Sequence, residues 1–341
     1  MSQLFFNQSL RVEDYWRAIV LFGRNVASYK FALAKSLLEL GPESGQLIKL
    51  DELARPFSRH VASHLKTSDK QATSSTSKFL DSCRRFNAGE ISEDQLVEQT
   101  VRLGFNNVID AFHVVGTDEI GQRFFVDRRK ERKGIEITDQ FSVLSGTDQI
   151  GSLPEEVEAR WRLVETSWAL GISRNLLRIE YVGTSEEFLA VSRDDRRTAV
   201  TSSRSALNGY QKGSCFYCFR TISLSDESVK PDVDHFFPHV LKQYGFGPLI
   251  DGVWNLVLAC RNCNRGPRGK GAKIPSQRLL ERLFKRNNFL ISSHHPLRET
   301  LIQQVGAQSG DQIRFLQEWH TNARKALIHV WECEEVVEPK F

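Results

Sequence analysis

The 341-residue chain lacks any apolar run long enough to cross a membrane. Two of its longest apolar runs are only AIVLFG and NLVLAC. The N-terminal sequence MSQLFFNQSLRVEDYW also lacks the basic start and apolar core of a secretory signal. We therefore expect a cytoplasmic protein without a membrane partner.

The chain also lacks a strong charge imbalance, since its formal net charge is only +4 at pH 7. With 40% hydrophobic and 26% charged residues, its composition is that of a globular protein. Net charge therefore does not by itself indicate nucleic-acid binding. The distribution of charge indicates more, because residues 261–286 hold nine basic residues and one acid, Glu281. Such a block is either a solvated face or the electrostatic footprint of phosphate binding.

Cysteine is scarce, and four of the six cysteines form two C-x-x-C pairs, CFYC and CRNC. Because disulfides are rare in the cytosol, such pairs indicate a metal site. A single C-x-x-C could be a redox pair, but two of them predict structural zinc. The segment between the pairs, residues 219–259, is longer than the roughly 15–20 residues typical of a zinc ribbon, so it contains an insertion. The predicted zinc ligands are Cys215, Cys218, Cys260 and Cys263.

The insertion contains VDHFFPH, in which Asp234 directly precedes His235. On its own, a histidine in a strand is most often a partly buried, hydrogen-bonded ring. Beside a metal site, its imidazole also suits a general base, and Asp234 on the opposite strand face can bind a metal ion. Asn264 directly follows Cys263 and offers an amide oxygen of the kind that Mg²⁺ accepts. Asn255 can bond backbone groups of the loop that carries His235.

The order C-x-x-C, D-H-x-x-P and N-x(4)-C-x-x-C-N resembles the HNH nuclease family over residues 215–273. The resemblance implies a ββα-metal fold in which the four cysteines hold structural Zn²⁺. It implies His235 as general base and Asn255 as the residue that orients the histidine loop. Asp234 and Asn264 are the implied ligands of a catalytic ion. Asparagine as the third signature residue resembles the HNH domains of RNA-guided CRISPR effectors and favours Mg²⁺ or Mn²⁺.

These features predict a metal-dependent DNA endonuclease that nicks one strand per active site. The Gly-rich stretch NRGPRGKGAK would allow close approach to a phosphate strand. Two alternatives stay open: a zinc-stapled nucleic-acid-binding module without catalysis, and an RNase that uses the same site. The expected phosphate contacts are Arg265, Arg268, Lys270 and Lys273.

The expected fold is α+β, in three parts. Residues 1–190 form a mostly α-helical N-terminal domain with a small hairpin and a regulatory or DNA-sensing role. Residues 191–290 form the HNH module, and residues 291–341 form a helical C-terminal extension. Chains with this architecture resemble bacterial anti-phage and restriction effectors, which implies defence-system proteins as partners. Restriction of modified DNA and a mobile-element nuclease are rival roles.

Local patterns predict several individual elements. A helix of the N-terminal domain ends at Gly41, and two strands meet at a basic turn from residue 127 to residue 134. Apolar periodicity predicts further helices at about residues 193–211, 276–289 and 311–326.

Overall fold

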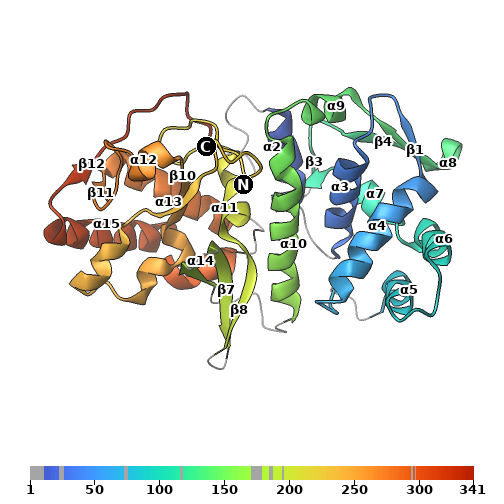
Figure 1. Ribbon diagram of the computed structural model, residues 1–341, viewed down its shortest axis with the longest axis horizontal. Coiled ribbons are helices and arrows are strands. Elements are labelled where there is room, and N and C mark those ends of the chain that lie inside the picture. The colour runs from blue at the N-terminus through green and yellow to red at the C-terminus, as the bar shows by residue number, and fades with distance from the viewer. Residues whose placement is uncertain are drawn as a thin grey trace. The chain divides into compact units, whose positions relative to one another are not determined.

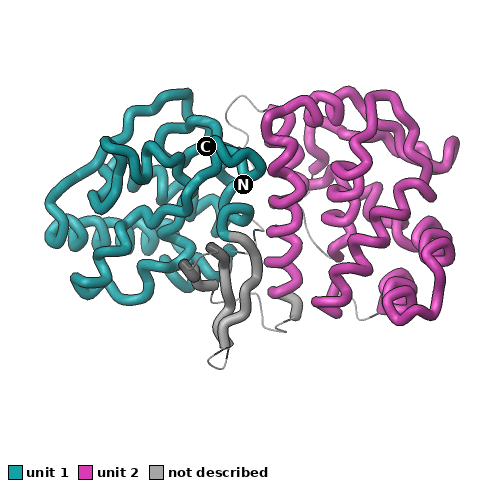
Figure 2. Tube along the Cα trace, viewed as in Figure 1, with its two compact units in different colours: residues 1–9, 172–341 teal, residues 10–171 magenta. Residues whose placement is uncertain are grey.

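The computed structural model contains two compact units, which are coloured separately in Figure 2. Unit 2 comprises residues 10–171, and unit 1 comprises residues 172–341 together with residues 1–9. The division therefore lies near residue 171 rather than residue 190, and the C-terminal extension belongs to the same unit as the paired cysteines. Among the described residues, no helix combines the length and apolarity needed to span a bilayer. The structure describes residues 11–22, 27–72, 76–115, 118–169, 179–183, 187–193, 196–292, 295 and 297–341.

The described part of unit 2 is mostly helical, as the sequence predicts (Figure 1). Its strands form a three-stranded antiparallel sheet of order β1-β5-β4 and a β2-β3 pair. Buried aromatic side chains from several elements fill the core, among them Trp16, Phe31 and Phe57. The elements are α2 (Val12–Phe22), α3 (Tyr29–Leu40), β1 (Leu47–Lys49), α4 (Leu50–Leu65), α5 (Lys78–Asn87), α6 (Glu93–Leu103), α7 (Val108–Ala111), β2 (Val114–Val115), β3 (Asp118–Glu119), β4 (Phe125–Arg128), α8 (Arg129–Arg132), β5 (Gly134–Ile137), α9 (Asp139–Ser145), η1 (Ile150–Ser152) and α10 (Leu153–Ala169).

Two local predictions for unit 2 are confirmed. Helix α3 ends at Gly41, whose φ of 55° is a left-handed conformation that glycine adopts at little steric cost. Strands β4 and β5 form the expected hairpin, and its basic tip is the single helical turn α8.

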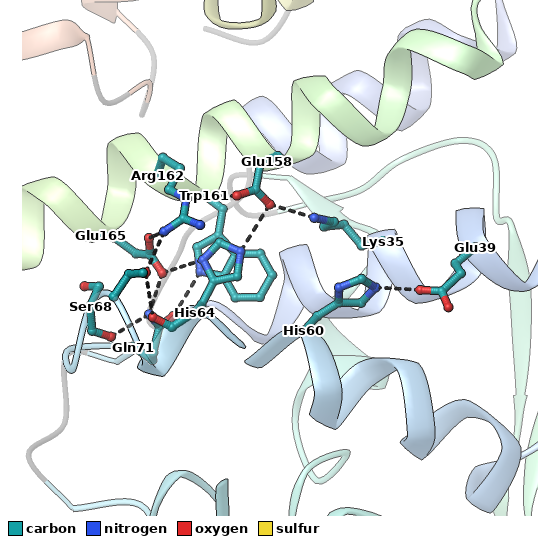
Figure 3. A network of polar contacts seen from close by, with 11 residues as sticks. Lys35, Glu39, His60, His64, Ser68, Gln71, Glu158, Trp161, Arg162 and Glu165 are labelled. Carbon is teal, nitrogen blue, oxygen red and sulfur yellow. Dashed lines mark hydrogen bonds and ion pairs between the residues drawn. The ribbon is translucent and has the colours of Figure 1, made fainter. Parts of the chain in front are cut away.

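A buried polar network joins α4 to α10 in unit 2 (Figure 3). The His64 ring stacks on Trp161 with a centroid separation of 3.5 Å. Its Nδ1 lies 2.6 Å from Glu165 and its Nε2 lies 3.1 Å from Glu158. Burial alone would lower the pKa of His64, but the hydrogen bonds and charges of the two glutamates outweigh burial and raise it. Lys35 pairs with Glu158 at 2.6 Å and Arg162 pairs with both glutamates, so the network holds three cations and two carboxylates when His64 is protonated.

This network predicts a loss of unit 2 stability as the pH rises. Because the folded-state pKa of His64 is raised, its contribution is complete below about pH 6.5 and is lost as the pH rises through the folded pKa. We expect a loss of about 1.5–3 kcal/mol, the usual contribution of a hydrogen bond to a charged group. Burial lowers the pKa of His60 and His113 to about 4 and about 3, so neither ring contributes to this alkaline loss.

Hydrogen exchange of α4 peptides, measured across pH 6–9 and corrected for intrinsic rates, would report the loss. The substitution His64→Gln should flatten this dependence. An equally steep dependence in His64→Gln would show that another group is responsible.

Unit 1 contains, among its described residues, an antiparallel sheet of order β6-β7-β8. The helix predicted at residues 193–211 is therefore wrong in its first half, because residues 196–202 form β8 and α11 begins at Ser203. The β-branched residues of the segment TAVTS favour a strand, and pairing with β7 outweighs any helical periodicity. The bounds are β6 (Ile179–Gly183), β7 (Glu187–Arg193), β8 (Arg196–Ser202) and α11 (Ser203–Gln211).

The rest of unit 1 surrounds the two C-x-x-C pairs. The helices expected at residues 276–289 and 311–326 are confirmed as α13 and α15. A short parallel pair joins β12, near the C-terminus, to β11. The elements are β9 (Asp232–His235), η2 (His239–Tyr244), η3 (Pro248–Asp251), η4 (Val253–Asn255), β10 (Leu256–Ala259), α12 (Arg261–Arg265), β11 (Ile274–Pro275), α13 (Gln277–Ser292), α14 (Arg298–Val305), α15 (Ser309–Ala326) and β12 (Val330–Trp331).

Candidate functional site

The two C-x-x-C pairs meet in unit 1. Cys215 and Cys218 lie at the turn that ends before residue 219. Cys260 directly precedes α12, and Cys263 lies within it. Their four Sγ atoms all lie within 4.8 Å of one another, and Cys218 Sγ is 3.8 Å from Cys260 Sγ. In a tetrahedral site with Zn–S bonds of about 2.3 Å, sulfur atoms stand about 3.8 Å apart. The four cysteines predicted from the sequence could therefore hold a structural metal ion such as zinc.

A fifth cysteine adjoins this thiol cluster. Cys333 Sγ lies 3.6 Å from Cys263 Sγ, although Cys333 is outside the group of four. The C-terminal segment that carries it is bonded to the module, since Val336 N donates to Cys218 O and Trp331 Nε1 donates to Arg268 O. No sequence pattern indicates this contact, because Cys333 belongs to no C-x-x-C pair.

A buried arginine supports the first cysteine turn. Arg282 of α13 donates to the carbonyl oxygens of Phe216 and Tyr217 at 2.7 and 2.8 Å. Its guanidinium carbon lies 4.1 Å from the ring centroid of Phe219, a non-glycine residue with a φ of 59°. Part of the basic block at residues 261–286 is therefore structural, and Arg282 is not available to a phosphate.

Strands β9 and β10 form an antiparallel pair that leads into α12. In this register His235 is opposite Leu256 and Asp234 is opposite Val257. Because side chains alternate along a strand, Asp232 and Asp234 share one face and His235 lies on the other. The His235 side chain is 14% exposed, and its Nε2 lies 3.1 Å from Asp251 Oδ1.

Asn255 binds the backbone on both sides of the loop that follows His235. Its fully buried side chain accepts a hydrogen bond from Phe237 N at 2.8 Å. Its amide nitrogen donates to Phe237 O at 3.0 Å and to Ile250 O at 2.8 Å. The preceding Gly252 permits the tight turn, since a Cβ there would lie 2.5 Å from Trp254 Cδ1. The bonding to the histidine loop that the sequence suggested for Asn255 is thus present.

Replacing Asn255 with alanine should weaken unit 1. The substitution would leave the buried Phe237 amide and two carbonyl groups without their partner, and each such group costs about 1–3 kcal/mol. We expect a lower urea midpoint and faster hydrogen exchange at Phe237. The matched control is Asn262→Ala, because Asn262 is an exposed asparagine on α12. Equal stability of the two variants would contradict this role of Asn255.

The carboxylate of Asp234 is bonded to two other side chains of the protein. It accepts a hydrogen bond from Tyr217 Oη at 2.6 Å and lies 3.1 Å from Lys270 Nζ. Burial raises the pKa of Asp234, although Lys270 and Tyr217 partly offset the effect. Lys270 also donates to His235 O at 2.8 Å. The Asp234–Lys270 pair therefore ties β9 to the segment after α12.

Asn264 contacts the carboxylate of Asp232, whereas the sequence predicted that it lies beside Asp234. Its amide nitrogen lies 3.1 Å from Asp232 Oδ2, and Arg265 lies 2.7 Å from Asp232 Oδ1. Asp234 and Asn264 are thus bonded to different side chains, Asp234 to Tyr217 and Asn264 to Asp232. Asp232 and Asn264 do place two oxygen-bearing side chains together. Asp232 was not a candidate from the sequence, although its position two residues before Asp234 puts it on the same strand face.

The four expected phosphate contacts differ in exposure. Arg265 and Arg268 are exposed, and Lys273 is half-buried with its ammonium 3.4 Å from Gly269 O. The expectation that Lys270 contacts phosphate is wrong, because its side chain is only 1% exposed and bonds Asp234 instead of facing solvent. The glycines also have a packing role, since a Cβ at Gly269 would lie 2.8 Å from Asn262 O.

The structure thus gathers the four cysteines, His235 and Asn255 around the β9–β10 pair, and it bonds Asp234 to Tyr217 and Asn264 to Asp232. The contacts of Asp232, Asp251, Arg282 and Cys333 were not predicted. Each depends on pairing between segments that are distant in the sequence. No protein-family model, curated protein or solved structure matches this chain, so its function is inferred from this geometry and the sequence motifs.

Proposed function

We propose that the chain is an HNH-type, metal-dependent endonuclease that hydrolyses phosphodiester bonds in DNA. The observation that supports this most is the set of Asn255 hydrogen bonds to the backbone beside His235. This buried side chain restrains the backbone two residues after a partly exposed histidine. Such a restraint is expected for a general base, which must be held within reach of its water.

In this proposal His235 removes a proton from the attacking water. Its position at the end of β9, beside an element clamped by the thiol cluster, restricts the movement of the ring. The basic side chains exposed nearby, Arg265 and Arg268, would contact the phosphate backbone and position it without reading sequence.

The proposal includes a requirement for Mg²⁺ or Mn²⁺. Asp232 and Asn264 would supply oxygen donors to a hydrated ion of this kind if the ion replaced the present contacts of Asp232 with Arg265 and with the Asn264 amide nitrogen. When bound, the ion would supply positive charge to the phosphate oxygens. The structural ion of the thiol cluster is proposed to be Zn²⁺, since it binds four thiolates tetrahedrally.

The experiment is a substrate panel under single-turnover conditions. Supercoiled plasmid, linear duplex, single-stranded DNA and single-stranded RNA are each incubated with the wild-type chain in Mg²⁺, in Mn²⁺ and in EDTA. We expect nicked circles from the plasmid and no product in EDTA. If only RNA is cleaved, the chain is an RNase and the proposed DNase activity is wrong. Binding of DNA without cleavage in either metal would overturn the nuclease and favour a binding module.

A further inference from the structure

A carboxylate that no sequence motif indicated lies against the candidate general base. Asp251, at the end of η3, places Oδ1 3.1 Å from His235 Nε2. The two side chains are 23% and 14% exposed, so water only partly screens their contact. Asp251 lies in the loop between His235 and Asn255.

The same asparagine holds both members of this contact. Asn255 bonds Phe237, two residues after His235, and also Ile250 O, directly before Asp251. The backbone segments that carry the imidazole and the carboxylate are therefore tied to one buried side chain. An incidental surface ion pair would not have both of its backbone segments bonded to one buried side chain.

The surroundings of Asp251 favour its ionised form. Lys242 pairs with Oδ2, and His239 Nε2 lies 3.6 Å from Oδ1. Burial would raise the pKa of Asp251, but the hydrogen bonds from His235 and Lys242 outweigh burial and lower it. An ionised carboxylate only accepts hydrogen bonds, so the contacting Nε2 of His235 must carry a proton. A neutral ring protonated at Nε2 has its basic lone pair on Nδ1.

We infer that Asp251 is a positioning residue for His235, which holds the imidazole in the tautomer whose Nδ1 acts as the base. The inference rests on the proposed function. In the reaction, the water oxygen bonds to phosphorus while its proton moves to Nδ1. The phosphorus–oxygen bond to one nucleoside breaks, and the leaving oxygen takes a proton from solvent. Asp251 then faces an imidazolium and stabilises its charge through the Nε2 proton.

The alternative is that Asp251 only fastens η2 to η3 through Lys242. The two roles are separated by Asp251→Asn and by the matched control Lys242→Ala. An asparagine can turn its amide nitrogen toward Nε2 and so favour the opposite tautomer, while Lys242→Ala removes only the partner of Oδ2. Asp251→Ala serves as the variant without any hydrogen-bonding group.

Two readouts are measured on each full-length variant. Plasmid nicking in Mg²⁺ gives kcat and KM, and ¹H–¹⁵N spectra of the histidine side chains give the tautomer of His235. The substitution His235→Ala assigns that signal among the nine histidines. We expect Asp251→Asn and Asp251→Ala to lower kcat by about 10²-fold with little change in KM, and Asp251→Asn to shift the tautomer. Lys242→Ala should stay within a few-fold of the wild type.

The outcomes separate this inference from the proposed function. If the wild type cleaves DNA and Asp251→Asn retains its kcat, or Lys242→Ala loses as much activity as Asp251→Asn, the positioning role is overturned. If the wild type cleaves nothing but Asp251→Asn still shifts the His235 tautomer, the nuclease proposal fails while the contact itself is supported. If the tautomer and kcat are both unchanged in a folded Asp251→Asn, Asp251 has no role at the base.

Discussion

Replacing Cys263 with serine should abolish metal binding and the cooperative unfolding transition of unit 1. The thiol cluster joins the turn before residue 219 to α12, and it lies beside the two short strands β9 and β10. A structural zinc ion contributes about 10–16 kcal/mol of apparent binding free energy in small modules, whereas a whole domain is stable by only about 5–15 kcal/mol. Metal content per chain and urea unfolding would measure both effects.

The control for this substitution is Cys333→Ser. Cys333 is the cysteine nearest to the group of four, but it is outside that group. We expect its variant to retain the metal and the unfolding transition. If Cys333→Ser lost the metal while Cys263→Ser kept it, the ligand assignment would be wrong.

The substitution His235→Ala should give a folded protein that does not cleave DNA. Strand pairing with Leu256 and the bond from Lys270 both use the backbone of His235, so they survive removal of the ring. The loss of a general base lowers the rate by about 10²–10⁴-fold. Single-turnover plasmid nicking gives the rate, while metal content and the thermal midpoint verify the fold.

His239→Ala is the matched control, because His239 lies close to His235 but its side chain is 59% exposed. Its rate should stay within a few-fold of the wild type. An active His235→Ala variant would remove His235 from the mechanism. A variant that lost the metal together with its activity would contradict the prediction that His235 is not needed for the fold.

Local features were the part of the fold that the sequence predicted well. Gly41, the hairpin of β4 and β5, and helices α13 and α15 each follow from turn chemistry or apolar periodicity within a short window. The four-thiol group was also predictable, because ligand spacing within each C-x-x-C pair is itself local.

The errors arise where distant segments decide the outcome. Residues 196–202 form β8 because β7 is available to pair with them, and a single window does not contain that information. Lys270 looked like a phosphate contact because it lies in a basic run, but the buried Asp234 attracts its ammonium. Asp251 and Cys333 approach the site only through the packing of η3 and of the C-terminal segment.

Four thiolates are expected to hold one metal ion and so to build the part of unit 1 that carries His235. X-ray absorption spectroscopy of the purified wild-type chain tests this most directly. We predict zinc with four sulfur ligands at about 2.3 Å, unchanged in Cys333→Ser. Nitrogen or oxygen in place of one or more of these sulfurs, or a folded unit 1 that contains no metal, would contradict it.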